Sequence, residues 1–467
     1  MSKSVKWYHS PYKPLLFETG DIYICRVVPS ENSIHFEWLS IGDTEYNVYY
    51  RKGVPYCVGE ADLEYKLFTS TKNTECNITE LETDIDYEFY VESGNKKSRI
   101  RLAHTGEHVG TAVNYVHPED KVYSFSGNCL CSPSMVRHPD GYLLSSMDLY
   151  KEEAPQNLTL IFRSDDDGKT WHYVSELMPC FWGKMFIHGG ELYMLSCSTE
   201  YGDVLIGKST DGGKTWTEPS VLLRGSCNFK YPGCHKNPQN IMHHNGRIYE
   251  TLEWGAWPAG FHAVMVMSCP EDADLLDADN WSFTEPVKYD ENWPGTVEGK
   301  CGGNIEGTLV VAPDGNLYNI MRYQTNGAKP SYGYALAYKV NTKDHTAPLE
   351  YSHAIEFPAN LSKFMIIKDS KSDYYYTICN RITNPKAPTM RNLLSLMKSK
   401  DLKKWELAKD IIDMRHKNGW MYGFQYVNFE IEGDDIIFVC RTAMNGAENF
   451  HNSNYQTFHR IENFRKY

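Results

Sequence analysis

Short runs of alternating hydrophobic and polar residues, separated by tight turns, fill most of the chain. The turns include Pro139-Asp140-Gly141, His244-Asn245-Gly246 and Pro313-Asp314-Gly315. A period of two places every second side chain on one face of a strand, and proline, asparagine, aspartate and glycine favour the turns between strands. The pattern predicts an all-β protein. From residue 107 to the end there is room for about six units of roughly 45–65 residues each.

Two of the turns share one eight-residue pattern, S-x-D-x-G-x-T-W. It occurs at Ser164–Trp171 and again at Ser209–Trp216. We expect the aspartate to cap N–H groups of the turn, the glycine to adopt a backbone conformation that a Cβ would penalise, and the tryptophan to cover the turn. Degenerate copies stand at Ser399–Trp405, which lacks the glycine, and at Asp279–Trp281, which keeps only the end of the pattern.

These repeats resemble the Asp-box of sialidase-like β-propellers, in which each copy marks the outer hairpin of one blade. The resemblance implies a six-bladed β-propeller glycoside hydrolase over residues 107–467. The final strand, Asn454–Ile461, is expected to close the ring against the first blade. The boxes carry no chemistry, so catalysis is expected at the opposite end of the propeller, on the inner strands and their loops.

Residues 1–106 are predicted to form a separate domain. They contain a strand with a core tryptophan, Trp38, a tyrosine-rich strand at Tyr46–Tyr50, and an L-x5-Y-x-F-x-V ending. These features resemble a fibronectin type III sandwich, with Leu81 and Tyr87 in the tyrosine-corner positions. The predicted fold is therefore all-β, with an N-terminal β-sandwich followed by a six-bladed β-propeller.

Charge and composition narrow the possible partners. The formal net charge is −13, and no basic stripe exists to neutralise phosphates, which argues against nucleic acid. The start, Met1–Tyr8, lacks the apolar stretch of a signal peptide, and no run is long enough to span a membrane, so a cytoplasmic location is expected. Thirteen scattered cysteines suit reduced thiols. Cys129-Leu130-Cys131 and Cys234-His235 lack a second ligand pair, so no metal or other cofactor is expected.

The resemblance implies the catalytic residues one by one. Glu306 opens one strand and Arg322 closes its hairpin partner, at the spacing of the sialidase catalytic glutamate and second triad arginine. Arg391 stands where the third triad arginine belongs. Tyr426, before a Gly-Asp turn and an apolar strand, stands in the setting of the nucleophilic tyrosine.

This residue set is chemically coherent. A phenol with a pKa of about 10 is a weak nucleophile at neutral pH, so a carboxylate such as Glu306 must accept the proton of Tyr426. A neutral nucleophile avoids the like-charge repulsion that a carboxylate would meet beside an anionic sugar. Arginines bind such an anion through paired N–H donors.

One position departs from the family. Sialidases begin the propeller with an R-I-P motif whose arginine is the first of the triad, whereas this chain has Cys131 there, ahead of Ser132-Pro133. Loss of one arginine clamp removes roughly 1.5–3 kcal/mol of charged hydrogen bonding. This departure argues against sialic acid and makes a related sugar acid, such as a uronic acid, or a neutral sugar an alternative.

The general acid has two candidates. Asp148 ends an inner hairpin, and Glu153 lies on the following loop, nearer the position of the acid/base aspartate of sialidases. A loop carboxylate above the leaving group can protonate the glycosidic oxygen where burial raises its pKa.

Two further polar and aromatic clusters are candidates for substrate binding. The first offers His235 and, for stacking, Trp254; the second offers Arg441 and His451. The sequence thus predicts an exo-acting glycosidase that takes a terminal, acidic sugar as its carbohydrate substrate. A lyase acting on uronates and a carbohydrate-binding propeller without turnover are the alternatives.

Overall fold

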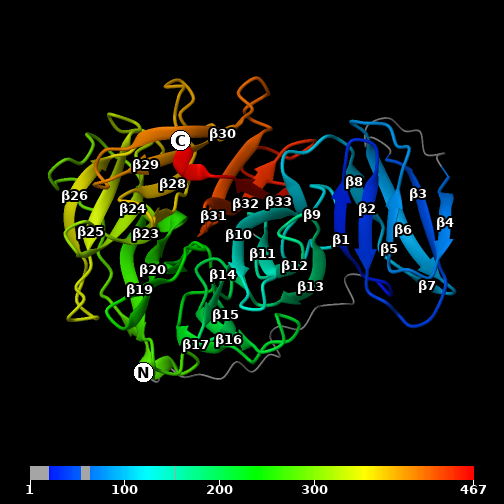
Figure 1. The fold of residues 1–467 in the computed structure, drawn as a ribbon, viewed down its shortest axis with the longest axis horizontal. Helices are drawn as coiled ribbons and strands as arrows, with labels where there is room; N and C mark the ends of the chain where they lie inside the picture. The colour runs from blue at the N-terminus through cyan, green and yellow to red at the C-terminus, as the bar shows by residue number, and fades with distance from the viewer. Residues whose placement is uncertain (1–19, 54–63, 153) are drawn as a thin grey trace.

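The computed structural model describes residues 20–53, 64–152 and 154–467, and this part of the chain is almost entirely β-structure (Figure 1). The described helices are three short 3-10 turns, Trp257–Ala259, Ala278–Asn280 and Phe464–Lys466. The predicted all-β class is confirmed. Within the described residues, no helix has the length and apolar character that crossing a membrane requires.

In the described part of the chain, six antiparallel sheets follow one another from residue 111 onward. Five of them are built from consecutive strands, each paired with its neighbour in sequence, except that β19 and β18 both pair with β20. The strands are β10 Cys129–Arg137, β11 Leu143–Tyr150, β12 Thr159–Ser164 and β13 His172–Leu177; β14 Phe181–His188, β15 Glu191–Cys197, β16 Val204–Ser209 and β17 Ser220–Leu223; β18 Gly233–His235, β19 Met242–His244, β20 Arg247–Ala256, β21 Phe261–Pro270 and β22 Ser282–Phe283; β23 Gly303–Val311, β24 Leu317–Gln324, β25 Tyr334–Lys339 and β26 Glu350–Glu356; β27 Ile366–Lys368, β28 Tyr375–Cys379, β29 Leu393–Ser399 and β30 Glu406–Asp413.

The sixth sheet joins the two ends of this series. Its order is β31-β32-β33-β9, with β31 Gly423–Glu432, β32 Asp435–Ala443, β33 Tyr455–Ile461 and β9 Thr111–Tyr115. The predicted final strand is thus present as β33, and it pairs with β9, which precedes the first sheet of the series. A sheet completed from both ends of the series closes the ring. This is the organisation of a β-propeller (Figure 1).

The repeated turns have one hydrogen-bond pattern. In the first copy, Thr170 donates from its backbone N to Asp166 at 2.8 Å, Gly168 has a φ of +86°, and the Trp171 indole donates to the Gly168 carbonyl at 3.1 Å. The copy at Ser209–Trp216 repeats these bonds. The degenerate copy is one residue shorter, and Leu402, at a φ of +64°, takes the place of the glycine. Each turn joins the third strand of its sheet to the fourth.

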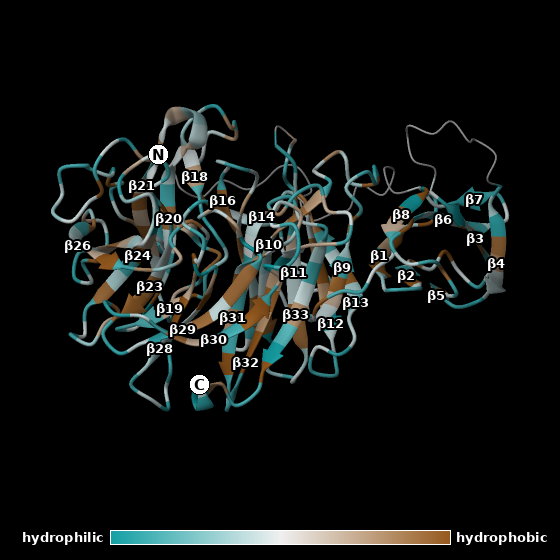
Figure 2. Cartoon of the chain, turned by 90° about the horizontal axis from the view of Figure 1, so that it is seen from above, coloured by the Kyte–Doolittle hydropathy of each residue, from teal (hydrophilic) through white to brown (hydrophobic). Residues whose placement is uncertain are grey.

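The first eight strands form two sheets at one end of the molecule (Figure 2). One contains β1 Ile24–Pro29, β2 Ile34–Trp38 and β5 Glu75–Ile78; the other contains β3 Tyr46–Lys52, β4 Lys66–Thr71, β6 Asp86–Ser93, β7 Lys96–Lys97 and β8 Arg101–His104. Trp38, Leu81 and Tyr87 are buried, and the Glu82 backbone N donates to the Tyr87 hydroxyl at 2.9 Å. The likeness to a fibronectin type III domain and the boundary at residue 106 stay predictions.

The N-terminal sheets share a hydrophobic core with the last sheet of the ring. The cluster that contains Trp38 and Phe89 continues into Tyr115 of β9 and Tyr455 of β33. A buried ion pair, Arg101 to Asp120 at 2.6 Å, lies at the same junction. Continuous apolar packing and a buried pair hold the two regions together more firmly than a polar linker would.

Three buried lysines connect the first strands of different sheets. Lys184 of β14 donates to the Met135 carbonyl of β10 at 2.9 Å, and Lys363 donates to the Val427 carbonyl of β31 at 3.0 Å. Lys236 lies 3.8 Å from the carboxylate of Glu250, whose two oxygens have no hydrogen-bond partner in the described structure. We call Lys184, Lys236, Lys363 and Glu250 the axial cluster. The first strands are therefore joined by polar contacts as well as by packing.

Candidate active site

A β-bulge recurs in four first strands and positions the candidate side chains. The pairing register shifts after Leu130 in β10, after Phe181 in β14, after Ile305 in β23 and after Gln425 in β31. Glu306 and Tyr426 are the bulged residues of the last two, with φ values of +53° and +56°. Non-glycine residues with positive φ are strained, and bulges often turn a side chain toward a site. Cys131 lies in the corresponding bulge of β10.

These bulges bring Tyr426 and Glu306, 120 positions apart, into direct contact. The Tyr426 hydroxyl donates to Glu306 Oε1 at 2.5 Å, and Arg322 of β24 donates to Glu306 Oε2 at 2.6 Å. Arg322 also donates to the Tyr426 hydroxyl at 3.2 Å. One carboxylate therefore binds a phenol and a guanidinium at the same time.

Electrostatics leave the glutamate charged and the phenol protonated. Burial alone would raise the pKa of Glu306, but the charge of Arg322 and the bond from Tyr426 outweigh it and hold the pKa below its ordinary value. Burial, with the charge of Glu306 adding to it, raises the pKa of Tyr426 to about 12. At neutral pH the pair is a proton donor beside an ionised acceptor, which is the state in which a base can activate a nucleophile.

Two more arginines surround the tyrosine. The guanidinium carbon of Arg441 lies 4.8 Å from the centre of the Tyr426 ring, and that of Arg391 lies 5.7 Å from it. Arg391 donates to Gln425, and Arg441 donates to the His451 carbonyl at 2.6 Å. Burial lowers the pKa of His451 well below its ordinary value, and the charge of Arg441 acts in the same direction, so its ring stays neutral.

The cluster carries more positive than negative charge. Arg322, Arg391 and Arg441 surround one ionised carboxylate, and the Nε atoms of Arg322 and Arg391 are buried without a hydrogen-bond partner in the described structure. Burial lowers the pKa of Arg391 to about 10, and the charges of Arg322 and Arg441 add to this effect. A bound anion would relieve this excess, because buried charges need opposite partners.

Arg441 lies close to the cysteine that replaces the first arginine of the sialidase triad. Burial raises the pKa of the Cys131 thiol to about 11, and the nearby charge of Arg441 opposes this rise. The guanidinium belongs to β32 of the last sheet, whereas Cys131 belongs to β10 of the first. A third arginine is thus present beside the tyrosine, but it comes from a different strand.

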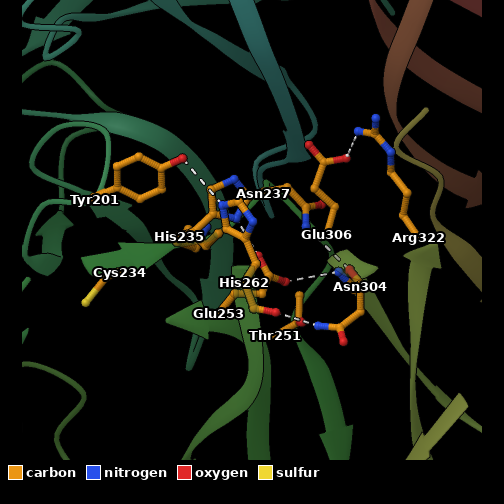
Figure 3. A network of polar contacts seen from close by, with 12 residues as sticks. Tyr201, Cys234, His235, Asn237, Thr251, Glu253, His262, Asn304, Glu306 and Arg322 are labelled. Carbon is orange, nitrogen blue, oxygen red and sulfur yellow. Dashed lines mark hydrogen bonds and ion pairs between the residues drawn. The ribbon is translucent and has the colours of Figure 1, made fainter. Parts of the chain in front are cut away.

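A histidine network adjoins the glutamate on its other side (Figure 3). His235 Nδ1 is hydrogen-bonded to Glu253 Oε2, and Glu253 Oε1 accepts from the Gly307 backbone N at 3.2 Å, next to Glu306. The ring centres of His235 and His262 are 4.8 Å apart. Burial lowers the pKa of His262 well below its ordinary value, with the His235 charge adding to it. His235 is therefore positioned by a carboxylate beside the candidate base.

Two other predicted residues, Asp148 and Trp254, are not brought to this cluster, and a third lies outside the described residues. Asp148 is fully buried; its Oδ2 accepts from the Trp182 backbone N at 2.9 Å, and burial raises its pKa to about 7. Trp254 packs on the hydrophobic core between its own sheet and the preceding one, since neighbouring strand residues face opposite sides and Glu253 faces the site. Glu153 lies outside the described residues. All three assignments stay predictions.

Sequence reasoning missed Glu253, His262 and Gln425. The sequence contained a signal for Glu253. Glu253 and Trp254 are neighbours on one strand and so face opposite sides of the sheet, and only one of the two sides can face the site. Gln425 and His262 gave no comparable signal, since an isolated polar residue within a strand does not reveal its spatial neighbours.

The comparisons with known proteins show the fold. No family model matches the chain, and no curated protein matches its sequence. An α-L-arabinanase of Penicillium chrysogenum, solved with arabinobiose, is 14% identical with a TM-score of 0.50, over 77% of this chain and 99% of that one. A GH93 α-L-arabinofuranosidase of Fusarium graminearum, also with arabinobiose, is 14% identical with a TM-score of 0.50, over 76% and 98%. The chain shares the propeller fold of these two glycosidases.

A leech intramolecular trans-sialidase, complexed with 2,7-anhydro-Neu5Ac, is 9% identical over 94% of each chain, with a TM-score of 0.48. The likeness to the two fungal structures confirms the expected glycosidase-like propeller as a fold, whereas the sialidase-type repeats and site residues stay predictions.

Proposed function

We propose that the protein is a glycoside hydrolase that removes a terminal acidic sugar, with Tyr426 as the nucleophile and Glu306 as its base. The observation that carries this proposal is the 2.5 Å bond from the Tyr426 hydroxyl to Glu306 within a ring of three arginines. Tyrosine nucleophiles of this kind are the known exception to the two-carboxylate scheme of glycosidases.

In the first step, Glu306 Oε1 takes the phenolic proton, Tyr426 Oη forms a bond to the anomeric carbon, and the bond to the leaving oxygen breaks. The leaving oxygen takes a proton from a general acid. In the second step, water gives a proton to the deprotonated general acid and adds to the anomeric carbon, the tyrosyl bond breaks, and the phenol recovers its proton from Glu306. The anomeric carbon is inverted twice, so its configuration is retained.

We assign the general acid to Glu153 rather than Asp148. Both carboxylate oxygens of Asp148 have partners within the protein, namely the Trp182 backbone N and the Thr159 hydroxyl. Asp148 is also fully buried. A proton donor must come within about 3 Å of the leaving oxygen, and a carboxylate enclosed in this way is poorly placed to do so.

The arginines support an acidic substrate. A sugar carboxylate bound by Arg322, Arg391 and Arg441 would balance their charge and supply an acceptor to the unpaired Nε atoms. Cys131 stands in place of the first triad arginine of sialidases, and Arg441 reaches the cluster from a different strand. The carboxylate of the bound sugar is therefore expected to lie in a different position from that of a sialidase substrate. This geometry favours a uronic acid or a related sugar acid.

The test is a product screen of the purified protein. The substrates are aryl glycosides of sialic acids, uronic acids, common neutral sugars and α-L-arabinofuranose. The last is included because the matched fungal proteins are arabinan-acting enzymes. The reaction is followed by released phenol and by ultraviolet absorbance. Phenol release from an acidic glycoside, absent from Glu306→Gln, supports the proposal. Release only from arabinofuranosides or other neutral glycosides overturns the acidic substrate.

Two other outcomes overturn hydrolysis itself. An unsaturated, ultraviolet-absorbing product formed from a uronate polymer identifies a lyase. Binding of an acidic sugar without any product, measured by calorimetry, identifies a carbohydrate-binding propeller.

A further inference from the structure

Four metal-ligating side chains meet where the N-terminal sheets contact the first sheet of the ring. His35 and Glu37 lie on β2, Glu75 lies on β5, and His172 is the first residue of β13. His35, Glu37 and Glu75 belong to one N-terminal sheet, whereas His172 belongs to the first sheet of the ring and lies far from them in sequence. None of them takes part in the candidate active site, and the sequence contains no motif that joins them.

The distances between their ligand atoms resemble those of a coordination sphere. Glu37 Oε1 lies 3.6 Å from His35 Nε2 and 3.2 Å from His172 Nδ1, and His35 Nε2 lies 4.0 Å from Glu75 Oε2. In a tetrahedral site with metal bonds of about 2.0–2.2 Å, neighbouring ligand atoms are about 3.3–3.5 Å apart. Of the four, His35, Glu37 and Glu75 offer ligand atoms that all lie within 4.8 Å of one another. His172 lies outside this set and reaches it through Glu37, so its exposed ring must turn toward the other two ligands to complete the site.

We propose that this cluster binds one zinc ion through His35, Glu37, Glu75 and His172. Two imidazole nitrogens and two carboxylate oxygens suit zinc, which binds imidazole more readily than magnesium or calcium does. His35 and His172 retain 32% and 56% side-chain exposure, and Glu75 retains 54%, so an ion can enter from solvent. The site departs from the expectation that the protein holds no metal.

The surrounding structure already fixes the central ligand. Glu37 accepts from Arg26 at 2.7 Å through Oε1 and from the Tyr173 backbone N at 3.3 Å through Oε2. Arg26 is itself held by the Val113 carbonyl at 2.7 Å. Ligating carboxylates are commonly hydrogen-bonded by such outer partners. The positive charge of Arg26 repels a bound cation. Two anionic ligands, Glu37 and Glu75, offset this repulsion better than neutral ligands alone would.

The ion would connect the two regions of the molecule. His35, Glu37 and Glu75 come from one N-terminal sheet, whereas His172 directly follows the first repeated turn, Ser164–Trp171, of the ring. Metal binding to the folded protein alone adds its binding free energy to stability. The zinc is therefore structural and does not serve in the proposed hydrolysis.

The experiment is a zinc titration of the metal-stripped full chain by isothermal calorimetry. A Cys227→Ser background removes an exposed thiol that would bind zinc independently. We expect one equivalent to bind, and we expect His35→Ala and His172→Ala each to raise the Kd at least tenfold. The matched control is His243→Ala, because His243 forms an exposed pair with Glu271 at 2.7 Å on another sheet.

Zinc-edge X-ray absorption of the bound form is expected to show a first shell of nitrogen and oxygen without sulfur. Absence of binding, unchanged affinity in either of the two cluster variants, or an equal loss in His243→Ala overturns the proposal. A sulfur-containing shell overturns it as well. None of these measurements depends on sugar turnover, so failure of the zinc site is distinguishable from failure of the proposed hydrolase.

Discussion

The ring contains two buried clusters of charged side chains, and the pKa values of the two clusters change for different reasons. In the candidate active-site cluster, formed by Glu306, Tyr426, Arg322, Arg391 and Arg441, Glu306 has direct partners in Arg322 and Tyr426, and its pKa falls. In the axial cluster, burial dominates: the pKa of Glu250 rises to about 8 and that of Lys363 falls to about 7. Direct ion pairing keeps charges in the first cluster, and desolvation tends to remove them in the second.

The two clusters also differ in exposure. Tyr426 and Arg391 retain 8% and 7% exposure, whereas Lys236 and Glu250 retain 0% and 1%. A site that binds an anion must hold its charge before the anion arrives, and the strained bulges at Glu306 and Tyr426 are consistent with that role. The axial lysines bind backbone carbonyls instead, which stabilises the ring.

The largest effect is expected from removing the reactive group of Tyr426 or of Glu306. Tyr426→Phe and Glu306→Gln are each expected to lower kcat by about 10²–10⁴-fold, because the nucleophile or its base is lost. The measurement is steady-state hydrolysis of the best glycoside from the product screen. The control, Tyr318→Phe, removes a hydroxyl that donates to Asp314 at an exposed turn, away from the candidate site. Retained activity in Tyr426→Phe would remove Tyr426 from the mechanism.

Substitution of Arg441 tests whether the excess positive charge of the candidate site binds an acidic substrate. Arg441→Met is expected to raise KM for an acidic glycoside about tenfold or more, since a charged hydrogen bond contributes roughly 1.5–3 kcal/mol, while KM for a neutral glycoside changes little. The control is Arg460→Met, which removes an arginine paired with Asp435 on the surface. Equal effects of Arg441→Met on acidic and neutral substrates would show that Arg441 only supports the structure.

Glu250 tests the axial cluster through the pH dependence of stability. Because burial raises its pKa from 4.5 to about 8, the folded chain binds this proton more tightly than the unfolded chain. The resulting stabilisation is complete below pH 4.5 and is lost as the pH rises to about 8. Lys363, with its pKa lowered from 10.5 to about 7, acts in the opposite direction above pH 7.

The Tm of the unsubstituted protein is therefore expected to fall between pH 5 and pH 8. The Tm of Glu250→Gln is expected to fall by a few degrees less over the same range. Thermal unfolding at the two pH values measures this difference. Glu218→Gln, at an exposed position in the loop before β17, is expected to follow the unsubstituted protein. Parallel behaviour of the Glu250 variant and the unsubstituted protein would mean that Glu250 is ionised in the fold throughout this range.

Local rules made much of the fold predictable. Period-two strands and Asp-Gly turns determine their own conformation, which is why Ser164–Trp171 and Ser209–Trp216 form the same hydrogen bonds. The Glu306 and Arg322 contact was also accessible, because the two residues lie on paired strands of one hairpin. The Asp-box resemblance supplied Tyr426, which local pattern alone does not connect to Glu306.

Long-range geometry decided the rest. Only the closed ring places β9 beside β33 and Arg441 near Cys131. Only the packing of the N-terminal sheets against the ring places His172 beside Glu37. Each of these contacts depends on how separate sheets pack, and on bulges that change which face a side chain occupies. The sequence by itself thus determined strands, turns and neighbouring hairpin contacts, because their energies are local. The tertiary structure alone decided which distant charges meet, because burial and the approach of separate sheets depend on the whole chain.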